Sequence, residues 1–226
     1  MKVLLTHGYF LSDDPKEQQI MKPYPPLGLL YISAFLDENN IENEVFDSTF
    51  STKAEQEAFI KEWQPDVVAI YTNLMTKLNV LDTARKVKVV SPDTKVIMGG
   101  PDVSYNTANY LKHGADFIVI GEGENTMLEL VQFLEKTPDE LPTEISGLAF
   151  IGHDGEEVKT AARVKVRDIN ELPIPNRDAI PIEKYLEAWK SRHGQSALNV
   201  STQRGCPYTC KWCSTAVYGQ SYRRRS

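Results

Sequence analysis

The sequence predicts an α/β fold built on a doubly wound parallel sheet of five strands. Up to about residue 135, short runs rich in β-branched residues alternate with segments of helical period, which is typical of βα units in a parallel sheet. Because parallel crossovers are almost always right-handed, five successive units most simply form a doubly wound sheet, which binds ligands at its carboxyl edge. The predicted strands are residues 2–6, 44–47, 66–71, 95–98 and 117–120.

Helices are expected between these strands. Apolar residues recur at helical spacing over 27–39, where Asn39 and Asn40 supply a left-handed cap. Thr52 and Glu55 form the pattern of a capping box, which opens a second helix. This helix is expected to end before residue 65, and the remaining helices are expected near 78–90, 106–113 and 125–135.

A small hairpin is expected after the sheet. Asp154 and Gly155 form a strong turn signal between two short strands, at 147–151 and 157–160. Because these strands are not separated by a helix, they do not continue the βα alternation. We therefore expect the hairpin to be a small attachment to the five-stranded sheet.

Prolines mark the segment after the hairpin. Pro173, Pro175 and Pro181 cannot lie inside one continuous helix, so this segment is expected to be a linker to a further domain. A last strand is expected at 196–202, and it leads directly into three cysteines. The expected units are a sheet domain at 1–136, a hairpin and linker at 137–195, and the first strand and cysteine loop of a second domain at 196–226.

Charge and composition exclude several classes of function. The 226 residues carry a net charge of −6, from 25 basic and 31 acidic side chains, which gives no global attraction to nucleic acid or anionic lipid. Three arginines at 223–225 are expected to be a solvated approach to a helix. The first apolar run turns polar at His7, too early for a signal peptide or a membrane span, so a cytoplasmic location is expected.

The three cysteines lie close together, as Cys206, Cys210 and Cys213 in a C-x-x-x-C-x-x-C spacing. With an odd number and no distant partner, they do not form a secreted disulfide framework. Cysteines this close can bind one face of a four-iron cluster from a single loop. Three thiolate ligands leave one iron open, and an open metal position is typical of a site that binds a substrate or cofactor.

A structural zinc site is the alternative interpretation of this cluster. It would need His193 as a fourth ligand, giving a Cys3His site. Thirteen residues, 206 minus 193, separate that histidine from the first thiol, with Gly194 and a predicted strand between them. This spacing favours the iron–sulfur interpretation.

The cysteine spacing, with aromatic Trp212 just before Cys213, resembles the signature of the radical S-adenosylmethionine superfamily. The resemblance implies that the three thiolates hold a 4Fe-4S cluster whose open iron is chelated by S-adenosylmethionine. Reductive cleavage of that cofactor would then give a 5'-deoxyadenosyl radical that abstracts hydrogen. By the same resemblance, Trp212 would lie beside the adenine, or it would simply pack against the loop.

The amino-terminal region resembles the cobalamin-binding domain of one subgroup of this superfamily. The resemblance rests on residues 22–29 after the first strand, 99–101 after the fourth and 121–124 after the fifth. Glycines at strand ends let the backbone approach a bulky planar cofactor closely. The cobalamin-binding residues that the resemblance implies are Tyr24, Thr72, Asn73, Gly99, Gly100, Pro101, Gly121, Glu122 and Gly123.

Three details depart from familiar cofactor motifs. The Asp-x-His-x-x-Gly motif, by which some cobalamin proteins supply a histidine to cobalt, is absent from the sequence, and His7 is the only histidine at an early strand end. Asp102 follows Gly-Gly-Pro, where relatives often carry histidine. The run 121–123 also resembles a dinucleotide fingerprint, but Thr126 replaces its third glycine and the run follows the fifth strand. Cobalamin without a protein histidine on its lower face is therefore the expectation.

Two classes of function remain open. The first is an enzyme that uses the cluster, S-adenosylmethionine and cobalamin for radical methylation or ring-forming chemistry on an unactivated carbon. This class resembles the radical methyltransferases and the anaerobic magnesium-protoporphyrin monomethyl ester cyclase. Its expected partners are a small-molecule substrate and a reductant protein of flavodoxin or ferredoxin type. The second is a module that binds cobalamin or a partner without catalysis, with the cysteines in a structural metal site. By the same resemblance, residues 196–226 are the first strand and cluster loop of a radical S-adenosylmethionine (β/α) barrel. Since 13 residues follow Cys213, most of that barrel is expected to be absent and the chain alone is expected to be inactive.

Overall fold

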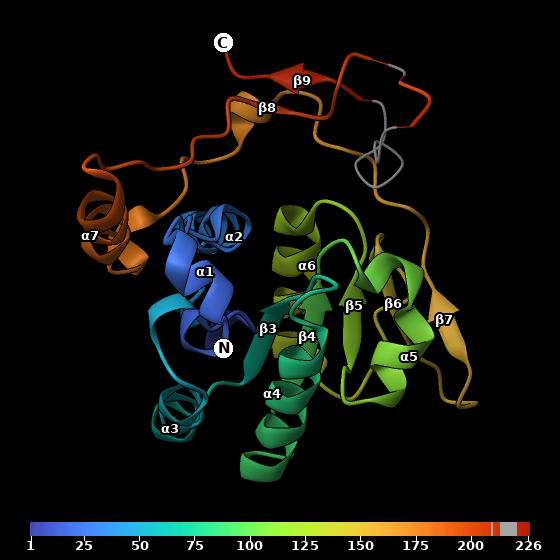
Figure 1. Ribbon diagram of the computed structural model, residues 1–226. Coiled ribbons are helices and arrows are strands. Elements are labelled where there is room, and N and C mark those ends of the chain that lie inside the picture. The colour runs from blue at the N-terminus through green and yellow to red at the C-terminus, as the bar shows by residue number, and fades with distance from the viewer. Residues whose placement is uncertain (209, 213–220) are drawn as a thin grey trace.

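A seven-stranded sheet with the order β2-β1-β3-β4-β5-β6-β7 forms the centre of the protein (Figure 1). The structure is a computed structural model that describes residues 1–208, 210–212 and 221–226. The first five strands pair in parallel, as predicted, because a helix crosses back between each strand and the next. The strands are β1 Val3–His7, β2 Asn43–Phe46, β3 Val67–Tyr71, β4 Lys95–Gly99, β5 Phe117–Val119, β6 Leu148–Ile151 and β7 Glu157–Lys159.

The predicted hairpin is β6 and β7, and it extends the main sheet. Gly155 occupies its turn with a φ of +82°, which glycine adopts without strain. β6 pairs antiparallel with β5, and the rings of Phe117 and Phe150 lie 6.0 Å apart across that pair. The hairpin is therefore continuous with the parallel strands and covers the edge that β5 would otherwise expose.

Helices cover both faces of the sheet, which makes the fold doubly wound as predicted. One apolar cluster joins α2 and α6 to alternate strand residues such as Val3 and Leu5. A second cluster joins the intervening residue Leu4 to α3, α4 and α5 on the other face. The helices that the sequence predicted are α2 Leu27–Glu38, α3 Lys53–Trp63, α4 Lys77–Val90, α5 Thr107–Lys112 and α6 Gly123–Lys136.

The local signals that predicted these helices are present. Asn40 is left-handed, with a φ of +57°, directly after α2. The Thr52 side chain accepts a hydrogen bond from the Glu55 amide while the Glu55 side chain accepts one from the Thr52 amide. This reciprocal pair satisfies donors that the start of α3 would otherwise leave unpaired.

Two helices were not predicted, α1 Pro15–Ile20 and α7 Ile182–His193. The signal for α7 was present, since Pro181 precedes it, Gly194 ends it in a left-handed conformation, and Tyr185 and Trp189 are buried one turn apart. The linker segment therefore contains a packed helix. Short 3-10 turns occur at η1 Leu11–Asp13, η2 Ser48–Phe50, η3 Val103–Tyr105, η4 Ile169–Glu171 and η5 Arg177–Ala179.

The strand predicted at 196–202 is wrong. Those residues have no regular secondary structure and pair with no strand in the described part of the chain, and a strand needs a neighbour to satisfy its backbone. The strand there is β8 Gln203–Arg204, which pairs antiparallel with β9 Arg223–Arg224. The arginines at 223–225 thus begin in a strand, which corrects the expected helix approach. Figure 1 shows this hairpin crossing above the carboxyl ends of the sheet.

None of the helices in the described part of the chain has the length and apolar character that a membrane crossing requires.

Candidate functional site

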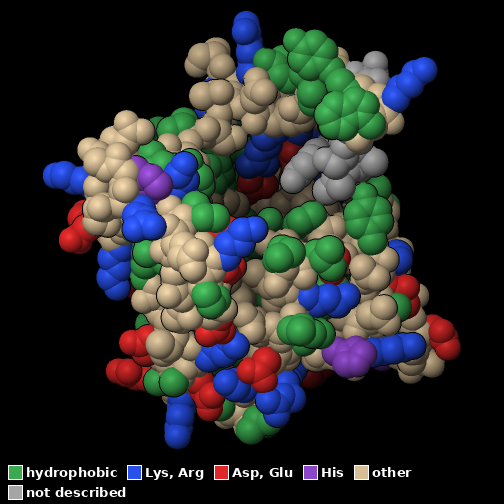
Figure 2. Space-filling model, viewed as in Figure 1, with side chains coloured by type: hydrophobic (Ala, Val, Ile, Leu, Met, Phe, Trp, Pro, Cys, Tyr) green, Lys and Arg blue, Asp and Glu red, His purple; other side chains and the backbone are tan. Residues whose placement is uncertain are grey.

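A cavity of about 730 Å³ lies where the parallel strands end, beneath the β8–β9 segment. Figure 2 shows the hollow between that upper segment and the body of the protein. The interior of the cavity is apolar because strand residues and the flanking faces of α2 and α6 form it. These apolar lining residues are Leu5, Leu27, Leu29, Ile32, Ala69, Ile97, Val119 and Met127.

The turn after β4 forms one wall of the cavity. Gly100 has a φ of +117°, and a Cβ there would lie 2.3 Å from the carbonyl oxygen of Thr72. The Thr72 amide also donates a 2.7 Å hydrogen bond to the Gly99 carbonyl. Only glycine fits at position 100, because the turn packs directly against the backbone that follows β3.

The turn after β5 forms a second wall. Gly121 has a φ of +92°, and its missing Cβ would point into open space. Glycine is therefore required by the backbone conformation and leaves room beside it. A Cβ on Gly123 would lie 3.2 Å from the Ile32 side chain, so this residue lets α6 begin close against α2.

The residues predicted to bind cobalamin separate into two groups. Those that line the cavity are Gly99, Gly100, Pro101, Gly121, Glu122 and Gly123. Thr72 is buried behind the first turn, and the Asn73 side chain accepts a 3.0 Å hydrogen bond from the Thr76 amide at the start of α4. Tyr24 packs on Trp189, with ring centroids 5.2 Å apart. These three residues do not line the cavity. Trp212, which was predicted to lie beside the S-adenosylmethionine adenine, is 92% exposed and does not line the cavity either.

Two carboxylates at the start of α6 pair with arginines from the β8–β9 hairpin. Arg223 binds Glu122 through two hydrogen bonds of 2.6 and 3.0 Å, and Arg204 lies 3.6 Å from the same carboxylate. Arg204 also forms an ion pair with Glu124. Burial acts to raise the pKa of Glu122, but the hydrogen bonds and charge of Arg223 outweigh it and hold that pKa below its ordinary value.

His7 belongs to a buried polar network outside the cavity. Its Nε2 lies 2.9 Å from Asp47, and its Nδ1 accepts a hydrogen bond of 3.2 Å from the Tyr9 amide. Tyr185 on α7 donates to the other oxygen of Asp47 at 2.6 Å and contacts the Thr49 hydroxyl at 2.9 Å. Both ring nitrogens of His7 are therefore engaged within the protein.

The cysteine site is only partly described. Cys206 is half-buried and Cys210 is exposed, whereas Cys213 lies outside the described residues. Within the described residues, no group of three or more His, Cys, Asp or Glu side chains is arranged to hold a metal ion. The Nε2 atom of His193, the candidate fourth zinc ligand, lies 2.8 Å from the Ile20 carbonyl oxygen.

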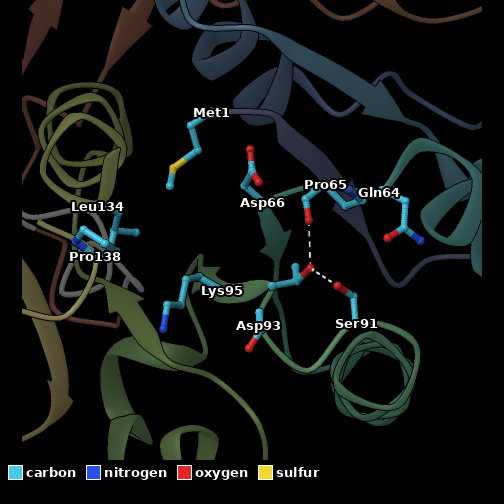
Figure 3. A pocket seen from close by; sticks show the side chains of 10 residues that line it. Met1, Gln64, Pro65, Asp66, Ser91, Asp93, Lys95, Leu134 and Pro138 are labelled. Atoms are coloured by element: carbon cyan, nitrogen blue, oxygen red, sulfur yellow. Dashed lines mark hydrogen bonds between the residues drawn. The ribbon is translucent and has the colours of Figure 1, made fainter. Parts of the chain in front are cut away.

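A second cavity, of about 400 Å³, lies at the opposite edge of the sheet, where β3 and β4 begin (Figure 3). Several of its polar groups hydrogen-bond to one another: the Thr94 hydroxyl donates to the Pro65 carbonyl at 2.7 Å and contacts the Ser91 hydroxyl. Asp66 accepts a 2.6 Å hydrogen bond from the Lys2 amide. This edge is opposite to the one where doubly wound sheets bind ligands.

Sequence reasoning missed the arginines and much of the apolar lining. The lining residues that no motif indicated include Tyr31, Lys165, Ser201, Gln203, Arg204 and Arg223. Arg204 adjoins the cysteine motif and Arg223 opens the run of three arginines, so both lie in segments with a recognisable pattern. Their acidic partners are too distant in sequence for a local pattern to reveal.

Comparison with protein families gives a match to the B12 binding domain over residues 19–131. Among curated relatives, an uncharacterized methyltransferase of Pyrococcus horikoshii, PH0819, is 30% identical over 89% of this chain and 43% of its own length. The anaerobic magnesium-protoporphyrin IX monomethyl ester cyclase of Rubrivivax gelatinosus is 25% identical over 100% of this chain and 40% of its own. The chain thus spans less than half the length of these relatives.

A comparison with solved structures gives the same fold. The cobalamin-dependent S-adenosylmethionine radical enzyme OxsB, with aqua-cobalamin bound, matches with a TM-score of 0.80 at 21% identity. The match covers 100% of this chain and 30% of OxsB. At this identity the likeness establishes the fold, including the segment after the sheet.

Proposed function

Because the chain belongs to the B12-binding domain family, we propose that it holds cobalamin at the carboxyl edge of its sheet and forms part of a radical S-adenosylmethionine enzyme. The observation that carries the cobalamin proposal is the cavity between the glycine turns after β4 and β5. Both turns lie inside the region that matches the family. They also lie at the edge where a doubly wound sheet binds its ligand.

The residues around the cavity fit a large and partly apolar ring system. Gly121 leaves open space where another residue would project a side chain. The apolar strand residues below it would pack against the apolar parts of the cofactor. Tyr71, the last residue of β3, lines the cavity, and Leu74, Met75 and Leu78, which follow it in the sequence, are 70%, 90% and 82% exposed.

We further propose that no histidine of the chain binds cobalt from the lower face. His7 is the only histidine at the end of an early strand, and Asp47 and the Tyr9 amide occupy its two ring nitrogens. Moving His7 toward a metal would leave the buried Asp47 carboxylate with fewer partners, which is costly. The cavity walls would therefore meet that face with glycine backbone and apolar side chains.

In the proposed enzyme, Cys206, Cys210 and Cys213 hold a 4Fe-4S cluster, and Trp212 lies near the S-adenosylmethionine adenine. With both cofactors bound, the cluster would supply electrons for radical formation and cobalamin would supply a methyl carrier or a one-electron metal centre. The chain's own residues orient the cofactors and exclude water around them. Methylation or ring formation on a small molecule, with electrons from a flavodoxin-type or ferredoxin-type protein, is the proposed reaction class.

Anaerobic reconstitution of the chain with iron, sulfide and aquacobalamin tests both parts. We expect one cobalamin per chain by absorbance after gel filtration, and close to four irons per chain. Replacing all three cysteines by alanine should abolish iron incorporation and leave cobalamin binding intact. Stoichiometric zinc that depends on His193 would contradict the cluster, and no retained cobalamin would contradict the cavity assignment.

A further inference from the structure

The strands of the β8–β9 hairpin form the two ends of the segment that contains all three cysteines. Arg204 pairs with Arg223 in the antiparallel register, and Gln203 pairs with Arg224. Cys206 follows two residues after β8, and the chain returns at β9. Whatever holds these four paired residues in place therefore fixes both ends of the cysteine segment.

The three consecutive arginines alternate in direction, as side chains on a strand do. Arg223 is directed to Glu122 and also donates to the Val166 carbonyl at 2.6 Å. Arg225 donates to the Leu172 and Pro173 carbonyls, both at 2.8 Å. Arg224, between them, is exposed. The inward arginines thus attach the hairpin to the sheet domain and to the linker.

The acidic partners of the hairpin stand in the cavity wall itself. Glu122 follows Gly121, and Glu124 lies in the first turn of α6. The Glu124 side chain is 5% exposed and that of Arg204 is 21% exposed. Pairs this deeply placed are screened less than surface pairs, and removing one partner leaves an uncompensated charge. Removing one partner of these pairs should therefore cost more than removing one partner of a surface ion pair.

The ring of Tyr31 on α2 provides a third point of attachment. The Arg204 and Arg225 guanidinium carbons lie 5.3 and 5.9 Å from its centroid, within the range of cation–π attraction. Tyr31, Arg204 and Arg223 all line the cavity. The residues that hold the hairpin are thus also walls of the proposed cobalamin site.

We infer that Arg204 and Arg223, with Glu122 and Glu124, are positioning residues. They hold the two described ends of the cysteine segment against the glycine turn after β5, at the cavity wall, and close the cavity from above. The identity of the cofactors rests on the proposed function, but the attachment itself does not.

Hydrogen exchange of the chain without cofactors tests the attachment. In the double variant Glu122→Gln/Glu124→Gln, backbone amides of the hairpin should exchange at least tenfold faster, while those of β3 and β4 remain unchanged. Glu129→Gln is the matched control, because Glu129 lies on α6 like Glu124 but pairs with Arg163, which is not part of the hairpin. Equal exchange in the double variant and in this control would overturn the inference, as would a general loss of protection in the sheet.

Arginine variants test the same attachment from the other side. Arg223→Met should expose the hairpin amides, whereas Arg224→Met, which removes the neighbouring outward arginine, should not. A charge exchange that combines Glu124→Arg with Arg204→Glu should restore at least part of the protection that either change alone removes. If neither single change alters hairpin exchange, these pairs do not position the segment.

Aquacobalamin dissociation gives a readout that a purely structural role would not change. Release from the Glu122→Gln/Glu124→Gln variant should be at least tenfold faster than from the unmodified chain or the Glu129→Gln control. Unchanged release would overturn closure of the cavity by the hairpin. A chain that binds no cobalamin at all would refute the proposed function, while the exchange experiment would still decide the attachment.

Discussion

The Tyr185 hydroxyl on α7 donates a 2.6 Å hydrogen bond to the carboxylate of Asp47, which lies 138 residues earlier at the end of β2. Both side chains are buried, and the same carboxylate faces His7 at the end of β1. Tyr185 also packs edge-on against Phe50, with ring centroids 4.8 Å apart. Helix α7 of the linker is therefore joined to the sheet domain both by a buried hydrogen bond and by the aromatic packing around it.

Replacing Tyr185 by phenylalanine should destabilise the chain by about 1–3 kcal/mol, because a buried carboxylate oxygen would lose its donor while the ring packing remains. Equilibrium unfolding in urea measures this difference. Tyr105→Phe is the control, because Tyr105 is 65% exposed. Equal midpoints for the two variants would show that the Tyr185 hydrogen bond contributes nothing.

Stability should fall at acid pH through Asp47. Burial acts to raise the pKa of this carboxyl, but the hydrogen bond from His7, with further hydrogen bonds from Tyr185 and the Thr49 amide, holds that pKa below its ordinary value of 3.8. A folded pKa below the unfolded one means that the contribution is fully present above the unfolded value and is lost as pH falls through the folded value.

The measurement is the free energy of unfolding between about pH 5 and pH 2. It should fall more steeply for the unmodified chain than for Asp47→Asn, which cannot gain this proton. Parallel curves for the two proteins would mean that Asp47 has the same pKa in the folded and unfolded chain.

The glycine turns offer a direct test of the cavity. Gly121→Ala places a methyl group in the open space beside the turn and should weaken aquacobalamin binding at least tenfold, about 1.4 kcal/mol. Gly155→Ala is a matched control, since Gly155 also has a positive φ and open surroundings but lies in the β6–β7 turn. Titration followed by absorbance compares them. Similar affinities in the two variants would place the cofactor elsewhere.

The sequence predicted those features whose cause is local. The alternation of strand and helix periods predicted the parallel sheet, and the glycines that follow the predicted strands indicated the turns at its carboxyl edge. Contacts between distant segments left no such pattern: Arg204 and Glu124 are 80 residues apart, and Arg223 and Glu122 are 101 apart. The strand predicted at 196–202 was wrong because its composition suits a strand but the described chain provides no neighbour for it.

The last prediction concerns cobalt coordination by the bound cofactor. The structure places His7 Nδ1 as acceptor for the Tyr9 amide, so Nε2 carries the hydrogen that faces Asp47. A nitrogen in either position has no lone pair available for a metal without breaking a buried hydrogen bond. The lower cobalt face should therefore receive no protein nitrogen.

Electron paramagnetic resonance of the bound cobalt(II) form, recorded on chain made with ¹⁴N or with ¹⁵N, measures this directly. An axial nitrogen from the protein would split the cobalt lines into triplets with ¹⁴N and doublets with ¹⁵N, whereas a nitrogen from the cofactor itself would not respond to labelling of the protein. We expect identical spectra for the two proteins. His7→Ala should leave these spectra unchanged while lowering stability, because Asp47 loses a buried partner. Doublets that appear only with ¹⁵N protein and vanish in His7→Ala would contradict this prediction. They would show that His7 leaves Asp47 to bind cobalt, and that the buried network at the end of β1 supplies a metal ligand.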